Sequence, residues 1–116
     1  PIAMPTATPY PNLVAYLLGP VKKRPAMYLG APKLSRLPNF IVGYQLGFSM
    51  AKPDDMLMDP YFGRGGFLDW YFTQYPERLS SFWTDSFLEE AQDDDELALN
   101  LFFDYLERYC QQREAP

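Results

Sequence analysis

The sequence predicts an all-α protein, folded as a compact single domain of four to five helices. Apolar residues recur at spacings of three and four along most of the chain, and no stretch alternates between polar and apolar residues for long enough to predict a strand. The chain has 116 residues, of which 47% are hydrophobic, so it can bury one substantial core. The nine Phe, nine Tyr and two Trp residues require that core, a partner surface, or both.

The N-terminal part contains three prolines in residues 1–9, a composition that predicts a flexible arm ahead of the helical domain over residues 10–116. Asn12 is placed to cap a short helix. The apolar face of that helix contains Leu13, Tyr16 and Leu17. Gly19 and Pro20 are expected to interrupt it, and Pro20 is well placed to open one further helical turn.

A basic, proline-containing segment comes next, with the sequence Lys22-Lys23-Arg24-Pro25-Ala26-Met27-Tyr28-Leu29-Gly30. Pro25 lacks a backbone N–H and disfavours helical geometry at Arg24, while Gly30 predicts a turn. We therefore expect an ordered, non-helical strap across the helical body. Met27, Tyr28 and Leu29 are expected to point inward, and Arg24 to pair with a carboxylate of the body.

Helical periodicity returns in four later segments, at about 35–51, 67–75, 76–91 and 94–112. Ser35 is placed to cap the first of them, and Pro38 falls in its first turn, where a missing N–H costs little.

Two glycines, Gly43 and Gly47, share one face of the segment at 35–51. Small residues at this spacing allow another backbone to approach closely. We therefore expect this helix to be central in the packing.

Charge is distributed unevenly along the chain. Residues 1–58 contain six Lys or Arg and two Asp or Glu, whereas residues 59–116 contain four and thirteen, and the net charge is -5. The run Asp93-Asp94-Asp95-Glu96 fits a solvated helix start, because carboxylates are favourable there. The alternative is that this run forms, with Glu89 and Glu90, an electrostatic docking patch for a basic surface.

The residue types exclude several kinds of catalytic and metal site. The chain has no histidine and one cysteine, Cys110, so it has no Ser-His-Asp or Cys-His pair and no Cys-x-x-Cys zinc site. Cys110 falls on an apolar helix face and is expected to be a buried, inert thiol. We expect no catalysis, no metal and no cofactor, although a hydrolase that uses two carboxylates remains a formal alternative.

The same composition indicates where the protein functions. A single cysteine fits a reducing compartment, and the sequence shows neither a signal peptide nor an apolar run of membrane-spanning length. The expectation is a cytoplasmic protein that binds neither membrane nor nucleic acid directly.

Trp70 falls beside Asp69, away from the main apolar stripe of its helix, and can either anchor a partner or pack beneath the strap.

Sequence motifs of this chain resemble those of two groups of proteins. The segment Lys23 to Gly30 resembles the KRPGMYIG segment of DNA gyrase B and related ATPase domains, but the nucleotide pocket of those longer α/β domains has no counterpart here. Over most of its length the chain resembles small bacterial proteins that have an RPxMYLG box and a Leu-x-x-Phe-Ile-x-Gly-Tyr helix, followed by an aromatic helix, an acidic run and a Phe-Phe-rich final helix. These features appear here as residues 24–30, residues 37–44, Phe82-Trp83, the run Asp93 to Glu96, and Phe102-Phe103.

Many proteins of that group resemble immunity proteins of interbacterial toxin systems. The resemblance implies a protein that binds a cognate toxin effector domain and occludes its active site, and an acidic surface suits a toxin that acts on nucleic acid or nucleotides. The expected toxin-binding residues are Glu89, Glu90, Asp93, Asp94 and Asp95 for charge, with Trp70 and Arg64 as further contacts. The alternative is a small-molecule or peptide-binding regulatory module. A homo-oligomer also fits the apolar surplus.

Overall fold

The computed structural model describes residues 13–51, 66–78 and 82–114, and within them it contains helices and no strand, which confirms the predicted all-α class. The α-helices are α1 (Leu13–Tyr16), α2 (Pro25–Leu29), α3 (Leu37–Ala51), α4 (Phe67–Gln74), α5 (Trp83–Glu90) and α6 (Asp95–Glu114). A π-helix, η1, covers Leu17–Val21, and 3-10 turns cover Leu34–Arg36 (η2) and Pro76–Arg78 (η3). The predicted arm over residues 1–9 lies outside the described residues.

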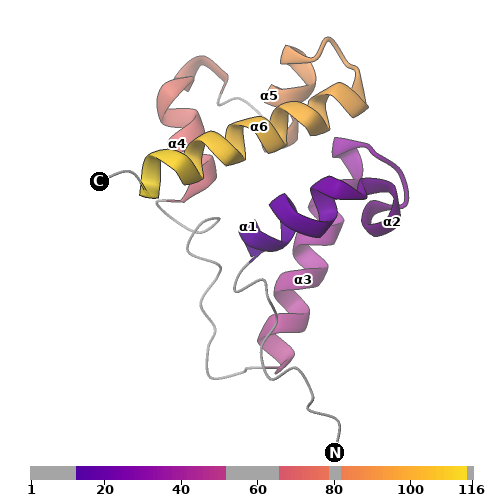
Figure 1. Ribbon diagram of the computed structural model, residues 1–116. Coiled ribbons are helices and arrows are strands. Elements are labelled where there is room, and N and C mark those ends of the chain that lie inside the picture. The colour runs from indigo at the N-terminus through magenta and orange to yellow at the C-terminus, as the bar shows by residue number, and fades with distance from the viewer. Residues whose placement is uncertain (1–12, 52–65, 79–81, 115–116) are drawn as a thin grey trace, which may run out of the picture.

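Helix α6 is the central element of the fold. It contacts α5 and α4 on one side and the N-terminal elements η1 and η2 on the other, as Figure 1 shows. Its apolar residues fit a 3.6-residue period, as the sequence predicted, and Leu99, Phe102, Phe103 and Leu106 are almost completely buried. Within the described residues, no helix is both long and apolar enough to cross a membrane.

The aromatic surplus goes mainly into the core. The rings of Tyr71 and Phe87 stack at 4.6 Å between centroids, and Phe102 meets Phe67 edge-on at 5.4 Å. All four rings are fully buried. Aromatic pairs in these geometries stabilise a core by about 0.5–1.5 kcal/mol beyond their buried area. The buried hydroxyl of Tyr71 is hydrogen-bonded to Ser86 at 2.6 Å, so its polar end is satisfied.

The predicted interruption at Gly19 and Pro20 is wrong. The helix continues from α1 into the π-turn of η1, which contains Pro20, and the N–H of Lys22 donates to the carbonyl of Leu17, five residues back. A proline in an α-helix clashes with the carbonyl four residues before it. The wider π-turn relieves this clash and lets the chain stay helical past Pro20.

The strap is also corrected by the structure, because Pro25–Leu29 forms the short helix α2. Pro25 takes the first helical position, where its missing N–H has no helical partner to lose, and Arg24 stays non-helical as predicted. Gly30 ends the helix in the left-handed region at φ 82°. Leu29 is buried and Tyr28 half-buried, but Met27 is 70% exposed and does not point inward as expected.

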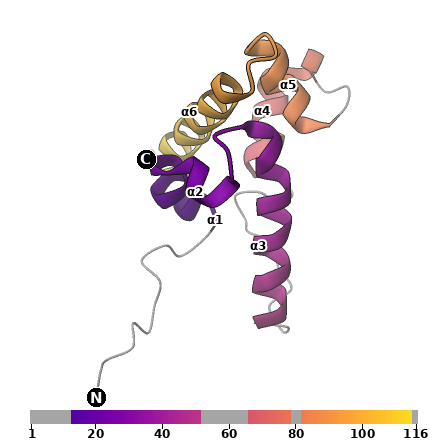
Figure 2. The same ribbon diagram turned by 90° about the vertical axis from the view of Figure 1, so that its right-hand side faces the viewer.

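Helix α3 begins with Pro38 in its first turn, as predicted, and its carboxyl-terminal part extends beyond the other helices (Figure 2). Ser35 lies inside η2 and does not cap α3. The expectation of central packing around Gly43 and Gly47 is wrong, because a Cβ at either position would have no atom of the described residues within 4 Å. Leu37 and Ile41 pack in the core near the start of the helix.

The remaining predicted helices are confirmed with one change. Helix α4 ends just before Pro76, and α6 begins at Asp95, both close to the predicted positions. The segment predicted at 76–91 is divided into η3 and the shorter α5, which has Phe82 before its first residue. The spacing in this segment predicts that Phe82 shares an apolar face with Trp83 and Phe87, but Phe82 is 57% exposed and does not join it.

Candidate functional site

The turn between α5 and α6 carries most of the acidic residues singled out in the sequence. Gln92 and Asp93 adopt left-handed conformations, with φ of 55° and 65°. The N–H of Asp93 donates to the carbonyl of Leu88 at 2.8 Å, and the N–H of Gln92 donates to Glu89 at 3.1 Å. These two hydrogen bonds form a Schellman motif that ends α5 and fixes the direction of the acidic run.

Three of the five predicted acidic contacts have partners inside the molecule. The carboxylate of Asp94 accepts from the N–H of Leu97 at 3.0 Å and caps α6. Asp95 accepts from both the N–H and the hydroxyl of Ser35, at 2.9 and 2.6 Å. The carboxylate of Glu90 accepts from the hydroxyl of Tyr105 at 2.8 and 3.0 Å. Asp95 and Glu90 therefore help to hold the fold together.

Several carboxylates around this turn are exposed to solvent, and Asp94 is one of them although it also caps α6. We define the acidic face as Glu89, Asp93, Asp94 and Glu96, all exposed, together with Leu97, which is 46% exposed. Leu97 was not singled out by the sequence analysis. The signal that could have found it is its position outside the buried stripe of α6, next to three carboxylates.

Trp70 belongs to α4, and Figure 1 shows that α4 lies at the end of α6 opposite to the acidic run. Its indole N–H donates to Gln112 at 3.0 Å, and its ring lies 5.5 Å from that of Tyr109. It packs against α6 and not beneath the RPAMYLG segment. Asp95 and Gln112 are about 25 Å apart along a helix of this pitch. Trp70 therefore does not share a surface with the acidic face, and Arg64 lies outside the described residues.

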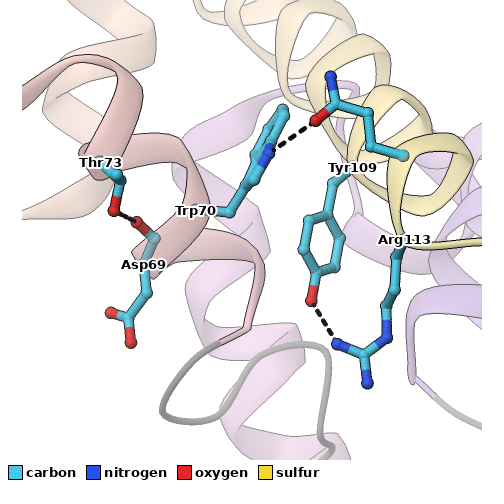
Figure 3. A pocket seen from close by; sticks show the side chains of 6 residues that line it. Asp69, Trp70, Thr73, Tyr109 and Arg113 are labelled. Atoms are coloured by element: carbon cyan, nitrogen blue, oxygen red, sulfur yellow. Dashed lines mark hydrogen bonds between the residues drawn. The ribbon is translucent and has the colours of Figure 1, made fainter.

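An open depression of about 500 Å³ surrounds Trp70 (Figure 3). The residues that line it are Asp69, Trp70, Thr73, Tyr109, Gln112 and Arg113. Arg113 donates to the hydroxyl of Tyr109 at 3.0 Å, and Thr73 donates to the backbone carbonyl of Asp69 at 2.7 Å. The depression thus combines two aromatic faces with charged groups of both signs.

A second depression, of about 440 Å³, lies between α1 and α3. Tyr16 is its centre, since its ring lies 5.7 Å from Tyr28, 6.2 Å from Phe40 and 6.1 Å from Tyr44. All four rings are half-buried. Tyr28 of the RPAMYLG segment therefore packs against the first helix and positions α2.

The described residues have a strong separation of charge. Residues 13–51 contain five Lys or Arg and no Asp or Glu, whereas residues 66–114 contain three Lys or Arg and twelve Asp or Glu. Lys22 forms an ion pair with Glu107 across the two parts. Arg24, which was expected to make such a pair, is exposed and forms none with the described residues.

No group of three or more Cys, Asp or Glu side chains among the described residues is arranged to hold a metal ion. Cys110 was predicted to be buried, but it is only half-buried. Comparison with protein-family models, with curated proteins and with solved structures returned no match.

Proposed function

We propose that this chain is a cytoplasmic immunity protein that binds the enzymatic domain of a cognate toxin and occludes its active site without catalysis of its own. The observation that carries the proposal is the charge separation, because residues 66–114 contain twelve acidic and three basic residues. The acidic face is the part of this region with the densest exposed charge. The resemblance of the RPxMYLG box and its following helix to immunity-like proteins gives the proposal its direction.

The acidic face suits a basic partner for two physical reasons. Concentrated negative charge attracts a positively charged active-site surface from a distance and raises the association rate, most strongly at low salt. Leu97, which is exposed and follows Glu96 in the sequence, then supplies apolar area whose burial contributes to the lifetime of a complex. Toxins that act on nucleic acids or nucleotides have basic active sites of this kind.

The test takes a toxin domain from a neighbouring gene, where such a gene is found, and measures the binding of that domain to the chain at several salt concentrations. We expect Asp93→Lys to slow association by roughly tenfold and to reduce the salt dependence, because it reverses a charge inside the interface. Glu77→Lys makes the same charge change at an exposed position in η3 and is expected to have a much smaller effect. Equal effects of the two variants would contradict the assignment of the acidic face.

The depression around Trp70 favours a second candidate, a small-molecule or peptide-binding regulatory module. Its two aromatic faces and the guanidinium of Arg113 can hold a planar or anionic ligand. A screen of metabolites by thermal denaturation tests this function, because a ligand that binds only the folded state raises the melting temperature. Loss of that shift in Trp70→Ala, with no loss in Asp93→Lys, would identify the depression as the site.

A further inference from the structure

The depression around Trp70 has charged groups of opposite sign on its two walls. Asp69 belongs to α4 and Arg113 to α6, and both side chains are exposed. Figure 3 shows the carboxylate of Asp69 at one side of the depression and the guanidinium of Arg113 at the other. The rings of Trp70 and Tyr109 lie between these two groups. The lining therefore complements a ligand that carries both a positive and a negative charge.

The two aromatic rings are held in place at their polar ends. The indole N–H of Trp70 donates to Gln112 at 3.0 Å, and the hydroxyl of Tyr109 accepts from Arg113 at 3.0 Å. The ring of Trp70 also stacks on Phe67, at 6.0 Å between centroids. Tyr109 is buried, whereas Trp70 is only half-buried and keeps part of its surface open. An apolar side chain can therefore pack on Trp70 without first ordering the site, which favours binding.

The placement of the two charges also sets the length of the ligand. Each charge comes from a different helix, α4 and α6 are in contact, and the axes of packed helices lie about 8–10 Å apart. A free amino acid carries its ammonium and its carboxylate on one α-carbon, so it reaches only one wall at a time. An extended peptide gains about 3.3–3.6 Å per residue, so two or three residues can place their termini against both walls.

We propose that the depression between α4 and α6 binds a short peptide of two or three residues that has free termini and an apolar side chain. The ammonium terminus pairs with Asp69, the carboxylate terminus pairs with Arg113, and the apolar side chain packs on Trp70. This inference rests on the second candidate function and deepens it, because it names the ligand class of the same site. It does not depend on the immunity function, whose acidic face lies at the other end of α6.

Heteronuclear NMR of the full chain tests the proposal with the tripeptide Gly-Leu-Gly, at a pH of about 6, where both termini are charged. We expect a saturable shift of the indole N–H signal of Trp70 and none of that of Trp83. N-acetylation and C-terminal amidation each remove one charge of the peptide, and each is expected to weaken binding about threefold, because the pairs lie at an exposed rim. Free leucine should bind more weakly than the tripeptide.

Two variants assign each charge of the peptide to its wall. In Asp69→Asn, binding should no longer respond to N-acetylation but should still respond to amidation, and Arg113→Gln should show the opposite pattern. Asp104→Asn is the matched control, because it neutralises an exposed carboxylate of α6 that does not line the depression. This control is expected to keep both responses.

Two results would overturn the proposal. One is the absence of a shift at Trp70 with millimolar tripeptide, and the other is equal binding of the free, acetylated and amidated peptides by the unmodified chain. If a different class of metabolite raises the melting temperature through Trp70 while the peptides fail to bind, the second candidate function stands and this ligand class is wrong.

Discussion

At the scale of single residues, the acidic run has two kinds of task. Asp94 and Asp95 stabilise the start of α6, and Asp95 also binds Ser35, so that the N-terminal elements are fastened to the central helix. Asp93 and Glu96 remain exposed and belong to the acidic face. The same sequence of four carboxylates therefore contributes both to stability and to the proposed recognition.

Replacing Asp95 by Ala removes two hydrogen bonds to Ser35, one of them from a backbone N–H. We expect a loss of about 1–2 kcal/mol in the free energy of unfolding, since hydrogen bonds to charged groups are stronger than neutral ones. Chemical denaturation with urea measures this change. Glu96→Ala removes a carboxylate from the same helical turn without a hydrogen bond to the described residues, and is expected to cost only about 0.5 kcal/mol. Equal losses would show that the contact with Ser35 contributes nothing.

The sequence was sufficient to predict the helix start at this run but not the second role of Asp95. Capping depends on residues that are close in sequence, and Asp94 and Leu97 are three positions apart. Ser35 is 60 residues from Asp95, so their contact depends on how α6 packs against η2. Ser35 was interpreted as a helix cap, because a serine side chain can serve either as a cap or as the partner of a carboxylate such as that of Asp95.

At the scale of elements, long periodic segments were predicted well and short proline-containing ones were not. Helices α4 and α6 have apolar faces that local sequence defines. Pro20 and Pro25 were both interpreted as helix breakers, but one lies in a π-turn and the other at a first helical position. Both exceptions depend on backbone geometry at a single residue, which apolar periodicity does not determine.

Helix α2 owes its end to Gly30, whose φ of 82° is strained for residues with a side chain. We expect Gly30→Ala to lower the free energy of unfolding by about 1–2 kcal/mol, as measured by urea denaturation. The cause is conformational, since the added Cβ would lie 3.6 Å from Arg36, an ordinary contact distance. Gly30→Asn should cost less, because asparagine tolerates the left-handed region. A loss as large for Asn as for Ala would point to crowding at this position.

Helix α3 illustrates what an apolar pattern leaves undecided. The helical period places Leu37 and Ile41 on one apolar stripe, and both are buried. Gly43 and Gly47 lie on another face, where no described atom is within 4 Å of an added Cβ. The sequence pattern indicates that a close approach is favourable there and does not say which helix approaches. Among the described residues, no atom of another helix lies within 4 Å of where a Cβ at Gly43 or Gly47 would be.

At the scale of the whole molecule, the fold joins a basic part of the sequence to an acidic part. The basic residues of 13–51 and the acidic residues of 66–114 are joined by the ion pair of Lys22 with Glu107 and by the contact of Ser35 with Asp95. The uneven distribution of charge was visible in the sequence. The sequence did not show that Trp70 and the acidic residues lie at opposite ends of α6, because this separation depends on the packing of α4 against that helix.

Affinity purification of the tagged chain from its native organism tests the central claim most directly. We expect one stoichiometric partner, distinct from a second copy of the chain, that carries an enzymatic C-terminal domain and is released as salt is raised. Asp93→Lys should reduce its recovery and Glu77→Lys should not. Recovery of the chain alone, as a monomer or a homodimer, even when the neighbouring gene is co-expressed, would contradict the immunity function.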